Sequence, residues 1–162
     1  MSQAPSAQKF KFCYIIRGLP GSGKSTVAQQ LAGASGVVLN LDSKVHKHSH
    51  VESSADGTAV TQEADSLVDI QKKHYAEFCQ EVQRGTPIIV VDNSNIKESE
   101  FLHFIEYAQQ EHYIASIVTL PAPHDLEIAA QRSTQNITVS ELSNMMSMYE
   151  PTSLAKLSRK GA

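Results

Sequence analysis

The sequence predicts an α/β fold in which a parallel sheet of about four strands carries helices on both faces. Three observations lead to this prediction. Short apolar runs alternate along the chain with segments whose apolar residues recur every three or four positions. The first run leads through a glycine-rich stretch into a helix, and polar residues suited to binding follow the later runs. This alternation favours three layers, with right-handed crossovers between parallel strands.

Each predicted strand is a short apolar run bounded by polar or turn-forming residues, as buried parallel strands are. The run IIVV before Asp92 is the strongest of these signals, and Pro121 closes the last strand. The second strand ends at Asp42. We place the four strands at residues 10–17, 37–42, 86–92 and 112–120.

Helical spacing and capping signals predict the helices. Asn95 with Glu98, and Thr138 with Glu141, have the spacing of capping boxes that open two of them. The stretch 43–61 has little apolar content and predicts a long polar loop. We place the helices at residues 24–31 and 63–84, after Asn95, at about 125–133, and between Thr138 and Pro151.

The composition is that of a globular protein, because 41% of the 162 residues are hydrophobic and 19% are charged. A formal net charge of −3 provides no global positive field for nucleic acid or an anionic membrane. Cys13 and Cys79 lack metal-binding spacing and fit reduced thiols. With no signal peptide and no apolar run of about 20 residues, we expect a soluble cytoplasmic protein without membrane contact.

The stretch RGLPGSGKST, residues 17–26, matches the phosphate-binding pattern G-x-x-x-x-G-K-S between a strand and a helix. Its glycines let backbone N–H groups approach phosphate oxygens, and the helix N-terminus adds a positive dipole end. We expect Lys24 to reach the β and γ phosphates and the Ser25 hydroxyl to bind Mg²⁺. The pattern predicts a P-loop NTPase fold with strand order 2-3-1-4, a small lid, and ATP and Mg²⁺ as cofactors. The expected phosphate-binding residues are Gly18, Leu19, Pro20, Gly21, Ser22, Gly23, Lys24, Ser25 and Thr26.

Two aspartates follow predicted strands, at the sheet edge where ligands bind in such folds. Asp92 comes after four apolar residues, as a magnesium-site carboxylate does, and would act on the metal through water. Its alternative role is to cap the turn through Asn93 and Ser94. Asp42 is a candidate general base for an attacking hydroxyl, with an Asx-turn ahead of Ser43 as the alternative.

Arg132 is the candidate for stabilising the charge of a transferred phosphoryl group. It lies where a predicted helix leads into the segment 132–138, which we expect to form the lid. An arginine supplied from a mobile segment can contribute about 10³- to 10⁵-fold in rate. The alternative is that Arg132 pairs with the last carbonyl groups of its own helix.

Five motifs, taken in order along the chain, resemble the polynucleotide 5'-kinase group of P-loop kinases. The motifs are RGLPGSGKST, NLD, VVDNSN, RSTQNIT and MMSMYEP. The similarity spans residues 12–151. It extends to the kinase module of bacteriophage polynucleotide kinase and to small AAA-type ATP-binding proteins related to the kinase domain of the Nedd4-binding protein. It implies transfer of the ATP γ-phosphate to a polynucleotide 5'-hydroxyl, with Asp42 as general base and Arg132 as lid arginine. Asp92 and Asn95 fall on family positions that make them candidate substrate contacts.

Two departures from the family pattern concern the acceptor. The phage-type motif continues as D-D-Y-R, with an arginine that helps to seat the acceptor, whereas Val45 stands at that position here. Lys44 is the candidate substitute, as a point charge without the bidentate geometry of arginine. The related small proteins carry RN followed by HGVP in the lid, where this chain has RSTQNIT.

Histidines raise two further questions. The stretch SKVHKHSH contains His46, His48 and His50 beside two lysines. It fits a solvated loop, a basic ridge that touches acceptor phosphates, or a transition-metal site. His74 lies on the apolar stripe of the helix over 63–84, which predicts a partly buried histidine with its polar groups satisfied.

These patterns are compatible with three functions. The first is a magnesium-dependent kinase for the 5' end of a nucleic acid. The second is a small-molecule kinase of the gluconate, shikimate or nucleoside kind, favoured by the net charge of −3 and the absent acceptor arginine. The third is a nucleotide-binding switch with slow ATPase activity that engages a protein.

The same domain organisation serves all three functions. We expect a flexible tail, one P-loop kinase domain that contains the acceptor-side loop and the lid, and a basic C-terminal tail. Their predicted bounds are 1–9 for the tail, 10–151 for the domain, 43–61 for the loop, 132–138 for the lid, and 152–162 for the basic tail.

Overall fold

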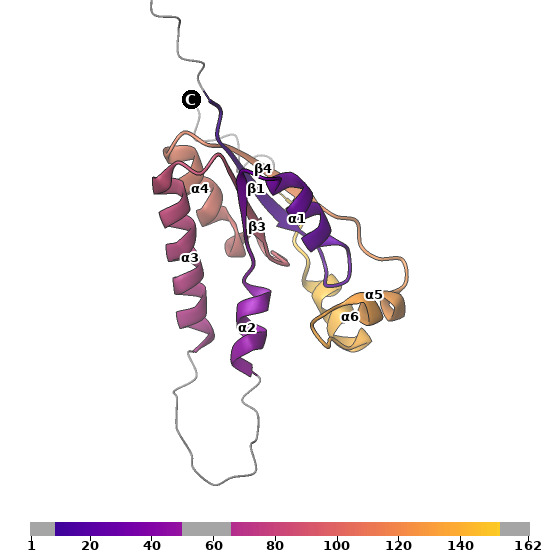
Figure 1. Cartoon of the computed structure of the whole chain (residues 1–162). Coiled ribbons are helices and arrows are strands. Elements are labelled where there is room, and N and C mark those ends of the chain that lie inside the picture. Colours follow the sequence, from indigo (N-terminus) through magenta and orange to yellow (C-terminus); the bar gives the residue numbers. More distant parts are fainter. Residues whose placement is uncertain (1–8, 50–65, 153–162) are drawn as a thin grey trace, which may run out of the picture.

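The computed structural model describes residues 9–49 and 66–152, and its centre is a parallel sheet (Figure 1). Its strands are β1 (Phe12–Arg17), β2 (Gly36–Leu39), β3 (Ile88–Asp92) and β4 (Ile114–Thr119). They lie in the order β2-β3-β1-β4, and every neighbouring pair is parallel. The predicted fold class and strand order are confirmed: this is the P-loop NTPase fold.

Helices cover both faces of the sheet, as Figure 1 shows. The helices α3 (Leu67–Arg84) and α4 (Leu102–Gln110) lie on one face, and α1 (Lys24–Ala32) lies on the other. Successive side chains of a strand point to opposite faces. Cys13 and Ile15 accordingly join the core under α3 and α4, while Ile16 packs under α1.

Aromatic side chains fill the core between α3 and α4. The ring centroids of Phe78 and Phe104 lie 4.9 Å apart at an interplanar angle of 89°. Both side chains are buried. Full burial of one such side chain stabilises a fold by about 1.5–3 kcal/mol. This layer therefore holds α3 against α4 and forms the inner wall of the site described below.

The residues after β2 form a helix, α2 (Asp42–Ser49), where the sequence predicted a loop over 43–61. The amide oxygen of Asn40 accepts a hydrogen bond from Ser43 N at 2.8 Å, and Leu41 O accepts from Lys44 N at 2.9 Å. These bonds start the helix from its polar residues, which carry no apolar periodicity that a sequence pattern could detect. The prediction was wrong for 43–49, and residues 50–61 lie outside the described residues.

The predicted capping box of Asn95 and Glu98 was also wrong. Asn95 adopts a left-handed backbone with φ 49°, and its buried amide donates to Ile16 O at 2.7 Å. The carboxylate that accepts a backbone N–H here belongs to Glu100, from Lys97 at 3.0 Å. A 3-10 turn, η1 (Glu98–Glu100), then precedes α4.

Two short helices, α5 (Leu126–Arg132) and α6 (Val139–Met148), lie together beyond the glycine-rich loop (Figure 1). The predicted capping box of Thr138 and Glu141 is present at the start of α6. An apolar cluster packs this pair of helices onto the body of the domain; its buried members are Leu19, Ile96, Ala129 and Leu142. No helix in the described parts of the chain has the length and apolar character needed to cross a membrane.

Arg17, the last residue of β1, is fully buried and joins three distant segments. Its Nε donates to Asn95 O at 2.8 Å, and Nη2 donates to Ile96 O at 2.9 Å. After α6, Glu150 O accepts from Nη2 and Thr152 Oγ1 accepts from Nη1, both at 2.6 Å. This arginine clamp ties the chain that leaves α6 to the exits of β1 and β3.

Two aromatic rings complete the arginine clamp. The guanidinium carbon of Arg17 lies 4.6 Å from the ring centroid of Phe101 and 4.4 Å from that of Tyr149. Cation–π contacts of this kind contribute about 2 kcal/mol when they are desolvated. The clamp accounts for the role of the YEP sequence after α6: its tyrosine stacks on Arg17, and its glutamate carbonyl accepts from it.

Arg17→Met is expected to lower the free energy of unfolding by about 3 kcal/mol or more, because buried carbonyl groups lose their donor. Arg17→Lys is expected to recover little of this loss, since an ammonium lacks the planar fork of donors. Urea unfolding measures both changes. Arg84→Met is the matched control, because the Arg84 side chain is 68% exposed. A loss no larger than that of the control would contradict a stabilising clamp.

Candidate active site

The glycine-rich loop between β1 and α1 has the backbone geometry of an anion site. Gly21 and Gly23 have φ values of 79° and 91°, in the left-handed region that side chains disfavour. Gly23 precedes α1 and caps it without a side chain, so the first-turn N–H groups are left for a ligand. A Cβ on Gly21 would lie 2.1 Å from Ala129 O, so α5 approaches the loop at a point where only glycine fits.

Lys24 is buried at the first turn of α1, and its Nζ donates to Leu19 O at 3.2 Å. Burial lowers the pKa of this amine, and the nearby carboxylates of Asp42 and Asp92 oppose that shift. The amine therefore lies close to both aspartates that the sequence singled out. A positive charge thus lies beside the loop, within the electrostatic influence of two carboxylates.

Three side-chain hydrogen bonds join residues 40–42, which follow β2, to residues 92–94 at the end of β3, and each spans 52 positions in the chain. The bonds are Asn40 Nδ2 to Asp92 Oδ2 at 2.9 Å, Leu41 N to Asn93 Oδ1 at 2.8 Å, and Ser94 Oγ to Asp42 Oδ2 at 3.4 Å. Leu39 and Val91, the last backbone partners of the two strands, have the same separation. This polar ladder thus continues the β2–β3 register beyond the sheet with side chains.

The polar ladder brings together two residues that the sequence predicted and three that it missed. Asp42 and Asp92 were candidates, whereas Asn40 was not considered, and Asn93 and Ser94 were considered only as parts of a turn. The signal that could have found the others is the pairing of LNLD with VDNS at a constant offset. Using that signal requires the strand register, which no local pattern contains.

Asp92 has one free carboxylate oxygen in the described structure. Its Oδ2 accepts from Ser25 Oγ at 3.0 Å and from Asn40 Nδ2, while Oδ1 is buried without a hydrogen-bond partner among the described residues. A buried unpaired oxygen is costly unless a cation or water satisfies it. Carboxylate and hydroxyl oxygens are suitable ligands for Mg²⁺ or its water shell. Ser25 and Asp92 therefore fit the predicted magnesium site.

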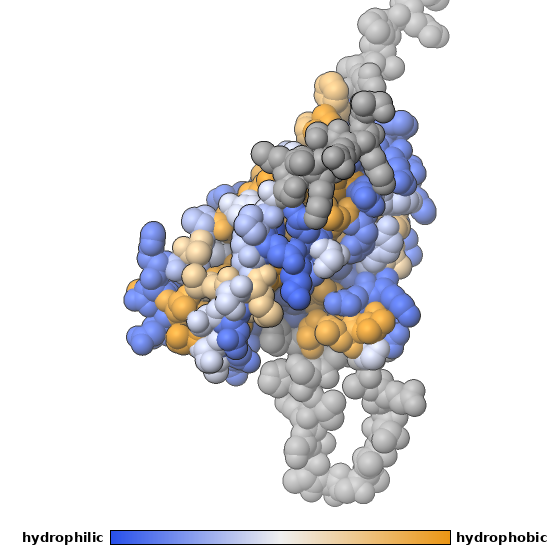
Figure 2. All heavy atoms as spheres, turned by 180° about the vertical axis from the view of Figure 1, so that it is seen from behind, coloured by the Kyte–Doolittle hydropathy of each residue, from blue (hydrophilic) through white to orange (hydrophobic). Residues whose placement is uncertain are grey.

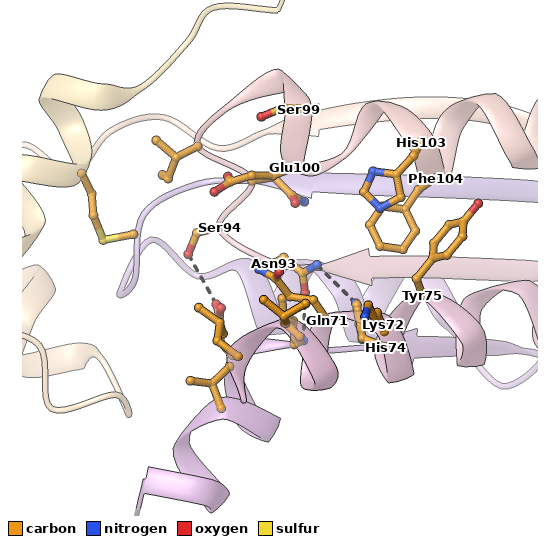
Figure 3. A pocket seen from close by; sticks show the side chains of 18 residues that line it. Gln71, Lys72, His74, Tyr75, Asn93, Ser94, Ser99, Glu100, His103 and Phe104 are labelled. Carbon is orange, nitrogen blue, oxygen red and sulfur yellow. Dashed lines mark hydrogen bonds between the residues drawn. The ribbon is translucent and has the colours of Figure 1, made fainter. Parts of the chain in front are cut away.

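A cavity of about 650 Å³ opens beside Asp42, between α2, α3 and the η1–α4 segment (Figure 3). Tyr75, His103 and Phe104 gather at one end of it, and the centroids of Tyr75 and His103 lie 4.9 Å apart. Other apolar lining residues are Leu41, Val45, Leu67, Val68, Ile96 and Met145. The charged side chains in the lining are those of Asp42, Glu100 and Lys72. The cavity is thus largely apolar and carries no excess of positive charge.

Apolar side chains also reach the surface near this end of the molecule, as Figure 2 shows. One exposed pair, Leu67 and Val68, lies at the start of α3 and lines the cavity. A second exposed group belongs to α5 and α6; its members are Ile128, Val139, Met146 and Met148. The mouth of the cavity is therefore apolar on the α3 side.

His74 is buried in α3 at 1% exposure, and it lines the same cavity. One ring nitrogen, Nε2, lies 3.3 Å from Asn93 Nδ2, and Nδ1 has no hydrogen-bond partner among the described residues. The expectation of a fully satisfied histidine was wrong. Burial, with a contribution from Lys44, lowers the pKa of His74 from 6.5 to about 4, and Glu77 partly opposes this shift.

The free energy of unfolding is expected to fall as the pH drops from about 6.5 to about 4, because His74 binds a proton in the unfolded state but not in the folded state. The loss from this group is about 3 kcal/mol across that window and zero above it. His103, whose pKa burial also lowers, contributes in the same direction. Urea unfolding across the window, with His74→Gln as reference, isolates the His74 share. Parallel pH profiles for the two proteins would contradict the prediction.

The remaining predicted site residues lie in different settings. Arg132 is exposed at the end of α5, one turn beyond Ala129. Lys44 forms an ion pair with Glu77 of α3 and is not among the residues that line the cavity. Asn95 lines the cavity, but its amide nitrogen is turned to β1. Among the described side chains, those of residues 9–45 and 66–152, no cluster of three or more His, Cys, Asp or Glu is suited to a metal ion. The side chains of His46, His48 and His50 lie outside the described residues.

Comparison with protein families gives a decisive match. A family model described as AAA domain matches residues 14–152, which include the glycine-rich loop, the polar ladder and the arginine clamp. The chain belongs to this AAA domain family. The match begins within β1 and runs to the end of the described residues, so it includes the P-loop and the helices on both faces of the sheet.

Solved structures resemble the AAA domain in fold. The crystal structure of Kti12 from Chaetomium thermophilum, in complex with ADP-AlF3, has a TM-score of 0.55 and 18% identity, covering 91% of this chain and 84% of that one. The crystal structure of APE1195 has a TM-score of 0.54 and 18% identity, with 90% and 83% covered. At 18% identity, these two similarities show that the fold is shared.

Proposed function

We propose that this AAA domain is a magnesium-dependent kinase that transfers the γ-phosphoryl group of ATP to a hydroxyl of an acceptor bound beside Asp42. The observation that carries the proposal is the position of the Asp42 carboxylate. The polar ladder holds it at the rim of the 650 Å³ cavity, and it is near enough to Lys24 to influence the pKa of that amine. A base, a cation and an acceptor space thus adjoin the loop.

The proposed reaction is an in-line transfer. The acceptor oxygen attacks the γ-phosphorus, Asp42 takes the hydroxyl proton, and the bond to the β–γ bridging oxygen breaks to release ADP. Lys24 and the N–H groups at the start of α1 stabilise the phosphate charge. Arg132 would add its guanidinium from the lid. Bound Mg²⁺ would be held by Ser25 and, through water, by Asp92, and would neutralise phosphate charge.

The nucleotide base has a candidate place on the opposite side of the loop from Asp42. A second cavity of about 270 Å³ is lined by Gly18 and Leu19 of the loop, by the chain after β4, and by Met146 and Tyr149 of the α6 segment. Its apolar lining suits the face of a planar base. The ADP-AlF3 in the similar Kti12 structure supports a nucleotide bound in this fold.

For the acceptor, we propose the 5'-hydroxyl of a polynucleotide or oligonucleotide, on the basis of the family resemblance. The aromatic end of the cavity, with Tyr75 and His103, suits a stacked base. Lys72 is the lysine among the lining residues. Lys44 is paired with Glu77, so an acceptor phosphate would have to compete with that carboxylate for it.

A small-molecule alcohol is the second candidate acceptor, and the charge of the cavity favours it. Its charged lining comprises two carboxylates, Asp42 and Glu100, against the ammonium of Lys72. Nucleic-acid sites normally carry an excess of cations that neutralise phosphates. A neutral alcohol with an apolar or planar body would suit this lining without such an excess.

Labelled transfer from γ-labelled ATP tests the proposal. The acceptors are DNA and RNA oligonucleotides with 5'-hydroxyl ends, unphosphorylated nucleosides, and a panel of small alcohols. We expect magnesium-dependent label on one class of acceptor, and the class that accepts it decides between the two candidates. ATP hydrolysis without label on any of them would contradict the kinase and support the nucleotide-binding switch.

A further inference from the structure

A second layer of contacts lies behind the polar ladder, at its middle rung. The side chain of Asn93 is buried and touches two partners. Its Oδ1 accepts from Leu41 N at 2.8 Å, and its Nδ2 lies 3.3 Å from Nε2 of His74 (Figure 3). A chain of hydrogen bonds therefore runs from the core helix α3 through Asn93 to the residue before Asp42.

The partners determine the direction of both bonds. A backbone N–H can only donate, so the group that faces Leu41 N must be the amide oxygen of Asn93. The amide nitrogen then faces His74 and donates, so Nε2 must be the unprotonated, accepting nitrogen of a neutral ring. The ring proton consequently sits on Nδ1, the atom that is buried without a partner among the described residues. If Nε2 carried the proton, it would face the amide nitrogen of Asn93, so two donors would point at each other. The Asn93 amide would then be expected to turn over and lose its bond from Leu41 N.

We propose that His74 is a positioning residue for Asp42, acting through Asn93. By accepting from the Asn93 amide, His74 keeps the amide oxygen aimed at Leu41 N and so sets the point at which α2 begins. The Asp42 carboxylate is the next residue, and Ser94 holds it from the same loop. The functional part of this inference rests on the proposed role of Asp42 as general base.

The buried position of His74 supports this role. Its ring packs edge-on against Phe104, with centroids 5.8 Å apart at 71°, which holds the ring orientation. An unpaired buried donor such as Nδ1–H costs about 1–3 kcal/mol. Against this cost, the imidazole has one hydrogen bond, which Nε2 accepts from Asn93, so the ring's polar contact at this buried place is the one with Asn93.

Nitrogen NMR of histidine side chains tests the first half of the proposal without any acceptor. We expect the Nδ1–H tautomer for His74 in the nucleotide-free protein at neutral pH. Signals of an Nε2–H tautomer, or of a ring averaging between the two, would overturn the inference. This result does not depend on whether the protein is a kinase.

Two substitutions test the second half. His74→Leu removes the acceptor, whereas the Oε1 of His74→Gln can replace Nε2. In His74→Leu we expect the Leu41 amide to exchange its hydrogen about tenfold faster, and His74→Gln to stay near the original protein. His124→Leu, an exposed histidine outside the site, is the matched control. An unchanged exchange rate of the Leu41 amide in His74→Leu would overturn the proposal. If His74→Leu does not fold, the proposal is judged by the His74 tautomer and by the Leu41 exchange rate in His74→Gln.

The consequence for catalysis has a separate readout. With an acceptor that the labelled-transfer experiment has identified, His74→Leu is expected to lower kcat by about 10²-fold, as small misplacements of reacting groups do. ADP affinity is expected to stay unchanged, and His74→Gln to restore kcat. Equal losses of kcat in the leucine and glutamine variants would contradict the positioning role. Failure of all transfer, with the expected tautomer and exchange, would count against the kinase and not against the contact chain.

Discussion

Asp42→Asn is expected to lower kcat for phosphoryl transfer by about 10³-fold while leaving nucleotide affinity nearly unchanged, as the loss of a general base does. The amide keeps the size of the carboxylate and can still accept from Ser94 Oγ, so the polar ladder is preserved. It cannot take a proton from the acceptor hydroxyl. Single-turnover transfer from labelled ATP measures the rate, and titration with ADP measures the affinity.

Asp125→Asn is the matched control for this substitution. Asp125 caps α5 by accepting from Glu127 N and Ile128 N at 2.9 and 3.1 Å, and asparagine caps helices equally well. We expect full activity in this variant. If Asp42→Asn retained the original transfer rate, Asp42 would not be the base. If neither protein transferred label but both hydrolysed ATP equally, the domain would be a nucleotide-binding switch.

Lys24→Met is expected to reduce transfer by about 10³-fold or more and to weaken nucleotide binding as well. Lys24 is buried beside the loop, and the carboxylates of Asp42 and Asp92 act on its charge, so it offsets theirs before any phosphate arrives. Methionine fills a similar volume without the charge. The phosphates would then enter a site with two uncompensated carboxylates.

Isothermal titration with ADP, in the presence and absence of Mg²⁺, measures the loss of affinity in Lys24→Met. Lys97→Met is the matched control, because Lys97 is exposed and its contact with Glu100 is made by the backbone N–H. If Lys24→Met bound ADP as tightly as Lys97→Met, the proposed contact of Lys24 with phosphate would be contradicted. The two experiments also separate the roles: Asp42 should affect the rate, and Lys24 both rate and affinity.

The glycine-rich stretch and the apolar runs were sufficient to predict the sheet order and the loop. Gly21 and Gly23 are needed for backbone angles that the residue type itself makes possible, so a local pattern indicates them. The four strands are similarly local, because a buried parallel strand needs a continuous apolar run. The capping box at Thr138 follows the same logic, since its partners are three residues apart.

Other elements could not be predicted from local patterns. The helix α2 has polar residues without periodicity, and it begins because Asn40 and Leu41 accept its first N–H groups. Asn95 resembled a helix cap, but the nearby β1 supplied a buried carbonyl that its amide satisfies instead. Arg17 becomes the centre of a clamp only because the chain returns to it after α6, which no local pattern indicates.

By itself, the sequence determined the P-loop, the strand order and the identity of Lys24, Asp42 and Asp92 as candidate groups. These depend on residue type and on spacing within short segments. Only the tertiary structure decided that Asp42 opens a helix at the rim of a cavity, and that Asn93 and His74 stand behind it. The contacts responsible join residues 52 and 19 positions apart, and the pairing of strands sets which of these side chains meet.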